Sequence, residues 1–267
     1  MTINFQKKLK PISDNNSRSI LPNILTVIGV CIGLTSIKFA LDERFDLSII
    51  AIILAAIFDG LDGRIARLIK GTSKVGKELD SLSDAISFGV APGFIMYFWY
   101  LNEMGKIGWV LSLVYIVCVA LRLARFNVYS NTNTSWKDNF FEGVPSPAGG
   151  ILVLLPLILD KSYIFELSEY RSELVTTMFI IIPLLMISKI PTYSLKKIII
   201  PRKLTVFLLF GIGVFFALLL IYTFKVIFVS GLIYLLFIPV SIIHYKMLKN
   251  KYKNINDLDE EEQEDML

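Results

Sequence analysis

The sequence has few of the residues on which many enzymes and secreted domains depend. Among its 267 residues are two cysteines and one histidine. Cys31 and Cys118 both fall inside long apolar runs, so they offer neither a disulfide framework nor the spacing of a metal site, and we interpret them as small buried core residues. His244 lies near the end of the last apolar run, where we expect an interfacial residue. A Ser-His-Asp triad therefore has no good candidate.

Charge is also scarce. Charged residues make up 19% of the chain and hydrophobic residues 54%, which is too apolar for a soluble domain of this length. No cleavable signal peptide is evident, because a polar and basic stretch precedes the first apolar run. The composition therefore predicts an integral membrane protein.

Apolar runs close to the ~20 residues needed to cross a bilayer recur along the chain. We predict eight spans, with six or seven as the alternative because charge interrupts several: 21–41, 46–70, 79–101, 107–127, 145–160, 174–190, 204–223 and 226–246. The expected fold is an all-α polytopic membrane bundle. Its parts are a cytoplasmic basic tail (1–19), a transmembrane catalytic domain (20–247) and a cytoplasmic acidic tail without regular structure (248–267).

The basic residues indicate the orientation. With eight spans and a cytoplasmic N-terminus, most of the 27 lysines and arginines fall in cytoplasmic segments. This distribution supports the even number of spans. It also places the facing ends of the second and third spans at the cytoplasmic side.

Those two spans carry paired carboxylates. Asp59 and Asp62 are three residues apart, and Asp80 and Asp84 are four apart, so each pair lies on one helix face. A short polar connection would bring the two faces together. Four converging carboxylates would repel one another and protonate unless a cation joined them. Hard oxygen ligands suit Mg²⁺ or Mn²⁺.

Small residues and a guanidinium share the face of the first pair. Gly63 and Ala66 leave space where a ligand can approach the helix, and Arg67 can hold a phosphate. With metal ions, this face suggests phosphoryl transfer on a nucleotide or pyrophosphate. The alternatives are a buried ion pair, such as Asp62 with Arg67, and a divalent-cation transporter. A transporter would need acids throughout the membrane depth, whereas these cluster near one side.

Written out, the spacing is Asp59, two residues, Asp62-Gly63, two residues, Ala66-Arg67, eight residues, Gly76, three residues, Asp80, three residues, Asp84. It resembles the signature of the CDP-alcohol phosphatidyltransferases at every fixed position. The stretches "LPNILT", "ELDSLSDAISFGVAP", "LRLARFN" and "FEGVPSPAGG" are similar to one branch, the bacterial CDP-diacylglycerol–serine O-phosphatidyltransferases. The resemblance covers roughly residues 20–160.

The resemblance implies transfer of a phosphatidyl group from CDP-diacylglycerol to an alcohol, with release of CMP. The four aspartates would form a two-metal site for Mg²⁺ or Mn²⁺, and Asp84 would also be the general base. The expected CDP-diacylglycerol contacts are Asn23, Thr26, Gly63, Ala66, Arg67 and Ser73.

The branch implies L-serine as the acceptor. Arg122 and Arg125 share one helix face and could clamp the serine carboxylate, and Ser146 could also contact the substrate. Alternatively the arginines are membrane-end anchors and Ser146 caps a helix. Another acceptor, such as glycerol 3-phosphate or inositol phosphate, is the nearest rival function.

The resemblance also implies partners and a location. Relatives form homodimers, so we expect a homodimer in contact with membrane lipids and no nucleic acid. The lipid substrate arrives through the membrane and serine through water. We therefore expect a bacterial inner-membrane protein whose active site faces the cytoplasm.

Overall fold

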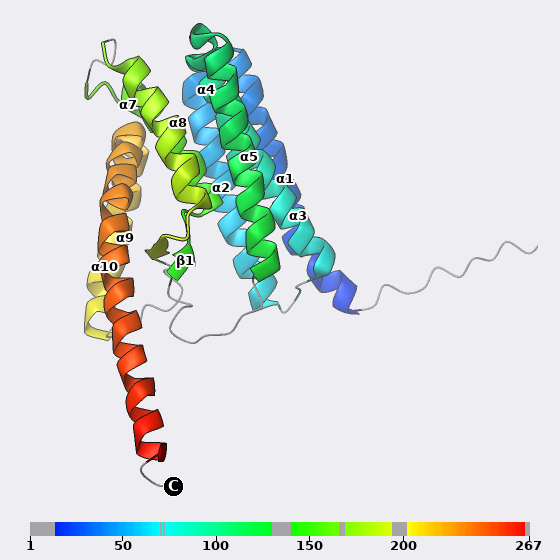
Figure 1. Ribbon diagram of the computed structural model, residues 1–267. Helices are drawn as coiled ribbons and strands as arrows, with labels where there is room; N and C mark the ends of the chain where they lie inside the picture. Colours follow the sequence, from blue (N-terminus) through cyan, green and yellow to red (C-terminus); the bar gives the residue numbers. More distant parts are fainter. Residues whose placement is uncertain are drawn as a thin grey trace, which may run out of the picture.

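The computed structural model describes residues 14–69, 71, 73–129, 140–165, 169–193 and 202–264, which are mostly helical (Figure 1). The α-helices are α1 (Asp14–Leu41), α2 (Phe45–Leu68), α3 (Lys74–Asp84), α4 (Ala91–Trp99), α5 (Lys106–Tyr129), α6 (Ser146–Val153), α7 (Leu155–Ser162), α8 (Arg171–Ile187), α9 (Arg202–Ile221) and α10 (Thr223–Glu264). A π-helix, η1 (Ala85–Val90), joins α3 to α4, and a 3₁₀ turn, η2 (Leu101–Met104), precedes α5. The short strands β1 (Phe140–Glu142) and β2 (Pro191–Tyr193) pair antiparallel.

Four segments of the described chain are long and apolar enough to cross a membrane: Ile20–Leu41, Lys106–Val128, Leu204–Ile221 and Thr223–Asn250. They coincide with four of the eight predicted spans. The other four predicted spans hold helices that contain charge (α2), are divided (α3 with α4, α6 with α7) or are short (α8). The prediction of an all-α, polytopic membrane bundle is confirmed.

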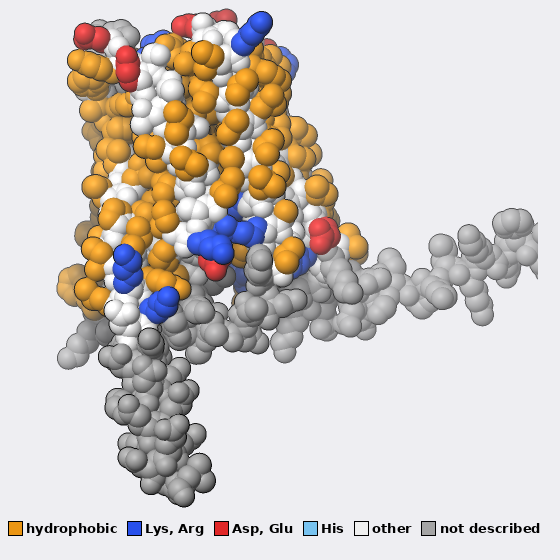
Figure 2. All heavy atoms as spheres, in the orientation of Figure 1, with side chains coloured by type: hydrophobic (Ala, Val, Ile, Leu, Met, Phe, Trp, Pro, Cys, Tyr) orange, Lys and Arg blue, Asp and Glu red, His pale blue; other side chains and the backbone are white. Residues whose placement is uncertain are grey.

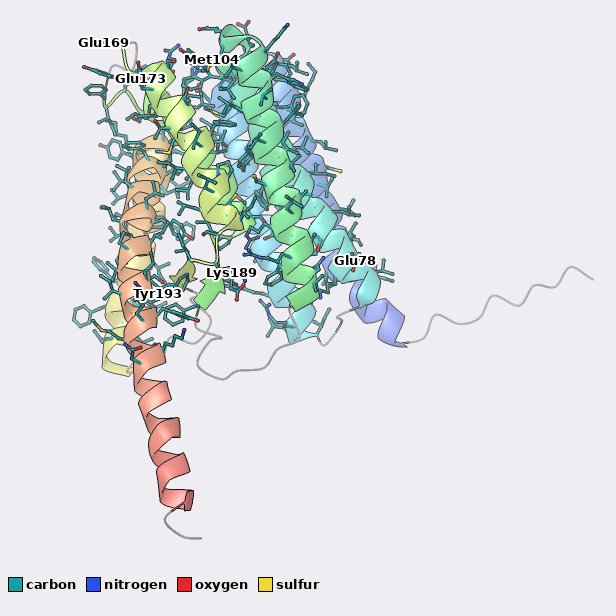
Figure 3. All side chains as sticks on the ribbon, viewed as in Figure 1. Glu78, Met104, Glu169, Glu173, Lys189 and Tyr193 are labelled. Atoms are coloured by element: carbon teal, nitrogen blue, oxygen red, sulfur yellow. The ribbon has the colours of Figure 1, made fainter. Side chains whose placement is uncertain are left out.

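The surface shows the division between membrane and water. Hydrophobic side chains cover most of the visible face, and charged side chains gather mainly toward its two ends (Figure 2). Met104, Glu169 and Glu173 lie toward one end, while Glu78, Lys189 and Tyr193 lie toward the other (Figure 3). Glu78 on α3 and Met104 after α4 lie toward opposite ends, so α3, η1 and α4 together cross the bundle as one span.

Two details differ from expectation. Cys31 is exposed, and not buried as predicted, because α1 packs against the bundle on one side only; Cys118 is half-buried. Helix α1 begins at Asp14, and its apolar segment begins at Ile20. Helix α10 continues to Glu264, although we expected 248–267 to lack regular structure. Glutamate, glutamine and lysine are good helix formers, so this stretch extends a helix that the preceding apolar run has already started.

The third predicted span changes its helix type directly after Asp84. In η1 the backbone follows a π-helix, a rare form that is frequent at functional sites. The hydroxyl of the fully buried Tyr115, on α5, donates to the carbonyl of Phe88 at 2.5 Å. This bond from a neighbouring helix fixes the wide turn and so helps to hold Asp84 in place.

The strand pair connects the core to α10. Phe140 of β1 pairs with Tyr193 of β2, and their rings stack with centroids 5.5 Å apart. The Tyr193 hydroxyl lies 2.9 Å from His244 Nδ1, on α10. His244 is exposed and packs edge-on against Phe140. Its contacts thus join α10 to the strands.

Candidate active site

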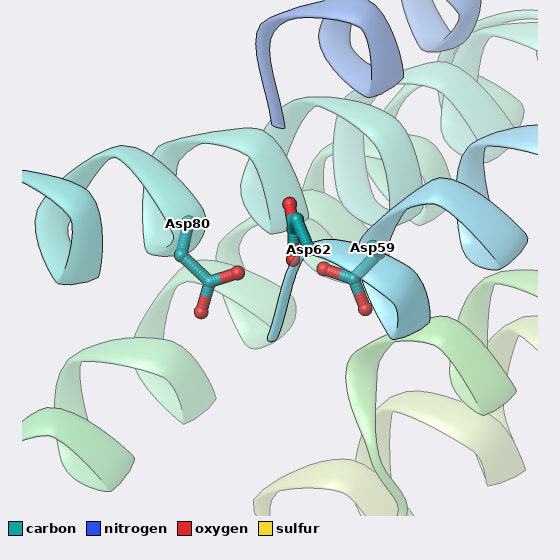
Figure 4. A group of neighbouring side chains, drawn as sticks. All are labelled: Asp59, Asp62 and Asp80. Carbon is teal, nitrogen blue, oxygen red and sulfur yellow. The ribbon is translucent and has the colours of Figure 1, made fainter. Parts of the chain in front are cut away.

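Three carboxylates from two helices meet in one place. Asp59 and Asp62 come from α2 and Asp80 from α3, and one oxygen of each lies within 4.8 Å of the others. The three side chains point toward one another (Figure 4). Helical spacing puts the first two on one face of α2. Helix α3 packs against α1 and carries Asp80 to the same place. The predicted convergence of the two helices is therefore present.

Asp84 lies beside this group. It ends α3, one turn after Asp80, and its carboxyl group is close enough to that of Asp59 for the two to interact electrostatically. Its Oδ1 is buried and has no hydrogen-bond partner among the described residues. Arg122, on α5, is close enough to interact with it electrostatically. A buried carboxylate oxygen without a hydrogen-bond partner can coordinate a metal ion or accept a proton from a substrate.

The arrangement disfavours the simple ion-pair interpretation. The ion pairs within the described ranges are Lys38–Asp42, Lys161–Asp46 and Arg171–Asp160, and none of them includes an acid of this cluster. Asp62 and Arg67 in particular form no ion pair. Carboxylates gathered without a paired cation repel one another. An all-oxygen set of this kind fits a hard divalent ion such as Mg²⁺ or Mn²⁺.

Helix α1 holds one of the acids. Thr26 is buried, and its hydroxyl lies 2.6 Å from Asp62 Oδ2 and 3.1 Å from the carbonyl of Pro22. The shorter contact fixes the orientation of the Asp62 carboxylate, which is itself only 3% exposed. A third helix thus contributes to the acidic site.

A cleft of about 550 Å³ opens beside the acids. The six residues predicted to contact CDP-diacylglycerol all line it: Asn23, Thr26, Gly63, Ala66, Arg67 and Ser73. Asp62 and Asp80 line it as well, so the cleft and the acidic site are continuous. The structure therefore brings together residues that are up to fifty positions apart in the sequence.

Two glycines shape this cleft differently. A Cβ at Gly63 would meet no atom within 4 Å, so the space beside this residue in the cleft is open. A Cβ at Gly76 would lie 2.9 Å from Asn23 Oδ1 and 3.1 Å from Ser73 Oγ. Gly76 thus allows the start of α3 to approach α1. Its N–H donates at 2.9 Å to the Oγ of Ser73, which is the N-cap of α3.

Sequence reasoning missed other residues of the cleft. Lys77 and Phe126 line it, with Pro22 and Gly71. Lys77 directly follows Gly76, a fixed residue of the family signature, and this position could have indicated that Lys77 lines the cleft. Phe126 comes from α5, whose end is tied to α3 by a 2.9 Å bond from Asn127 Nδ2 to Ser81 Oγ. No local pattern indicates that tertiary contact.

The two arginines proposed as a clamp have different surroundings. Arg122 is buried, and its Nη1 donates to Ser146 Oγ at 2.6 Å. Arg125 instead donates to the backbone carbonyls of Ile187 (2.5 Å) and Ser188 (3.1 Å) at the end of α8. Arg125 therefore caps a helix, and Arg122 alone of the pair faces the acids. Ser146 contacts Arg122 from the first turn of α6.

Comparison with known proteins gives a consistent result. The model of the family described as CDP-alcohol phosphatidyltransferase matches residues 19–190, which span α1 to the end of α8. The match includes every acid, cleft and arginine residue described above. Helices α9 and α10 lie outside it.

Individual relatives are similar over most of the chain. A protein of Mycobacterium leprae named CDP-diacylglycerol–serine O-phosphatidyltransferase is 38% identical over 236 residues, 86% of this chain and 76% of that protein. One of the same name from Helicobacter pylori (strain 26695) is 36% identical over 242 residues, 86% of this chain and 97% of that protein. An archaetidylserine synthase of Methanothermobacter thermautotrophicus is 33% identical over 181 residues, 64% of this chain and 68% of that protein.

Proposed function

This chain belongs to the CDP-alcohol phosphatidyltransferase family, and from that premise we propose that it transfers the phosphatidyl group of CDP-diacylglycerol to L-serine. The products are phosphatidylserine and CMP, so the enzyme acts in phospholipid biosynthesis. The observation that carries the proposal is the convergence of Asp59, Asp62 and Asp80 at the edge of the cleft. The names of the relatives support serine as the acceptor.

The four aspartates are the metal-binding residues of this proposal. Their oxygen donors, and the unsatisfied Oδ1 of Asp84, fit Mg²⁺ or Mn²⁺. Two such ions would neutralise charge on the pyrophosphate and on the departing CMP. Thr26 keeps the Asp62 carboxylate in one orientation, and so prepares the site before substrate binds.

The cleft binds the CDP part of the lipid. Its volume of about 550 Å³ falls in the range of small-molecule sites. The open floor at Gly63 lets the nucleotide approach α2. Arg67 and Lys77 supply positive charge for the phosphates, and Asn23 and Ser73 supply hydrogen-bonding groups.

Asp84 is the general base. It accepts the proton of the serine hydroxyl while the serine oxygen bonds to the β-phosphorus and the bond from that phosphorus to CMP breaks. This single displacement needs no covalent enzyme intermediate. Arg122, next to Asp84, pairs with the serine carboxylate and is held by Ser146.

The site lies at one end of the bundle, because residues of the connection between α2 and α3, Gly71 and Ser73, line the cleft. We place this end at the cytoplasmic side of the bacterial inner membrane, where serine and CMP exchange with water. The same location disfavours an ion path through the membrane. We further propose that the enzyme is a homodimer.

The test is release of CMP from CDP-diacylglycerol by the purified protein in detergent micelles. L-serine should support release, and glycerol 3-phosphate or inositol phosphate should not. Release with glycerol 3-phosphate alone would refute serine as the acceptor and retain the reaction class. No release with any alcohol would refute the reaction class as well.

A further inference from the structure

A second cavity lies between β2 and α10, outside the nucleotide cleft. It encloses about 360 Å³ and is lined by both elements, among others by Thr192, Ser230, Ile233, Tyr234, Phe237 and Ser241. Most of this wall comes from α10, which the family match does not include. The proposed reaction assigns it no role.

The cavity has an apolar mouth and polar groups inside. Ile233 and Phe237 are exposed, so the mouth lies on the apolar surface of α10. Ser241 is 1% exposed, and its hydroxyl has no hydrogen-bond partner among the described residues. The hydroxyl of Ser230, in contrast, is satisfied by the Val226 carbonyl of its own helix at 2.7 Å.

Tyr234 carries a second unsatisfied hydroxyl. The Tyr234 hydroxyl lies near the hydroxyl of Thr192 but forms no well-aligned hydrogen bond with it. The Thr192 hydroxyl instead donates to the Gly143 carbonyl at 2.8 Å. Leaving a buried hydroxyl without a partner costs about 1–3 kcal/mol. Two such donors in one cavity therefore point to a ligand that brings acceptor oxygens.

The cavity is linked to the acidic site through Arg122. This buried guanidinium is close enough to interact electrostatically with both Tyr234 and Asp84. Its Nε also lacks a hydrogen-bond partner within the described part of the chain. A ligand whose phosphate lies at the acids can thus extend past Arg122 into the cavity.

We propose that this cavity binds the diacylglycerol part of CDP-diacylglycerol, with the hydroxyls of Tyr234 and Ser241 donating to its ester carbonyl oxygens. The inference rests on the proposed function and assigns α10 a direct part in lipid recognition. The apolar walls fit an acyl chain, and the mouth on the lipid-facing surface lets the chain enter from the bilayer.

The polar groups that line the cavity suit diacylglycerol better than serine. Free serine carries an ammonium group that needs acceptors, and no acidic side chain lines the cavity within the described residues. An ester carries acceptors only, which match the two unsatisfied donors. Serine therefore belongs at Arg122, and the apolar part of the lipid in the cavity.

The test compares binding of CDP-diacylglycerol with binding of CDP, which lacks the diacylglycerol, to the full-length protein in micelles. Tyr234→Phe and Ser241→Ala should each weaken CDP-diacylglycerol binding about two- to tenfold, the effect of one hydrogen bond, and leave CDP affinity unchanged. Ser241→Leu, which fills the cavity, should weaken lipid binding further. Tyr222→Phe removes the hydroxyl of an exposed tyrosine directly before α10 and is the matched control.

Loss of affinity for the lipid alone, with CDP affinity retained, supports the assignment and shows that the variants fold. Unchanged lipid affinity, an equal loss for both ligands, or a raised KM for serine alone would overturn it. The binding assay does not need turnover. Failure of the proposed serine transfer would appear instead as absent CMP release by the unaltered enzyme.

Discussion

The hydroxyl of Thr26 on α1 donates to the Oδ2 of Asp62 on α2 across 2.6 Å. A threonine near the start of the first span thereby orients a carboxylate of the acidic site. Hydrogen bonds to charged groups are worth about 1.5–3 kcal/mol. We predict that Thr26→Val lowers Mn²⁺ affinity or kcat about tenfold to a hundredfold, measured by metal titration and CMP release.

Thr26→Ser is the control for this prediction, because it keeps the hydroxyl at the same distance from the backbone. It should retain most of the metal affinity and activity. If both variants behaved alike, the hydroxyl would have no role in orienting Asp62.

Gly63 and Gly60 provide a matched pair on α2. An added Cβ at either position would meet nothing within 4 Å, but only Gly63 lines the cleft. Leucine has a higher helix propensity than glycine, so Gly63→Leu and Gly60→Leu should both keep or raise the melting temperature. Gly63→Leu should weaken CDP binding about tenfold or more, because its side chain occupies the ligand volume.

Gly60→Leu should bind CDP as the unaltered enzyme does. Calorimetric titration with CDP and a thermal melt of each variant provide the two readouts. Normal CDP affinity in Gly63→Leu would show that the nucleotide binds elsewhere.

The two arginines of α5 should separate in their effects. Arg122→Ala should raise the KM for serine, because it removes the cation next to Asp84. Arg125→Ala should leave that KM nearly unchanged and lower the melting temperature, because it removes two bonds to the end of α8. Steady-state kinetics with varied serine and thermal melts distinguish the two. Equal increases in the KM for serine in the two variants would show instead that both arginines bind the serine carboxylate.

Asp84→Asn tests the base. An asparagine keeps the size of the side chain and cannot accept the serine proton, and general-base catalysis contributes about 10²- to 10⁴-fold. Turnover should fall by that amount while CDP-diacylglycerol binding is largely retained. Turnover at the normal rate would remove Asp84 from this role.

The site was largely predictable because its signals are local. Asp59 and Asp62, like Asp80 and Asp84, lie at helical spacing on consecutive predicted spans. Ionisable groups are costly inside a membrane, so those that occur there usually mark a functional site. Gly63, Ala66 and Arg67 of the cleft follow from the helix face that carries Asp59 and Asp62. Asn23, Thr26 and Ser73 were found through the resemblance to a family. Their gathering along one cleft needed the structure, since Phe126 reaches it by a tertiary contact of α5.

The parts that could not be predicted depend on packing between distant segments. Arg122 and Arg125 are equivalent in sequence, and only the position of the end of α8 separates them. Cys31 lies in an apolar run like any core residue, but whether it faces protein or lipid depends on how α1 packs. The cavity at Ser241 forms only because β2 lies against α10.

The most direct test of the central claim uses protein stripped of metal by EDTA and supplied with CDP-diacylglycerol and L-serine. We predict no CMP release until Mg²⁺ or Mn²⁺ is restored, and Asp59→Asn or Asp80→Asn should require more metal than the unaltered enzyme. Full CMP release in the presence of the chelator would contradict the account.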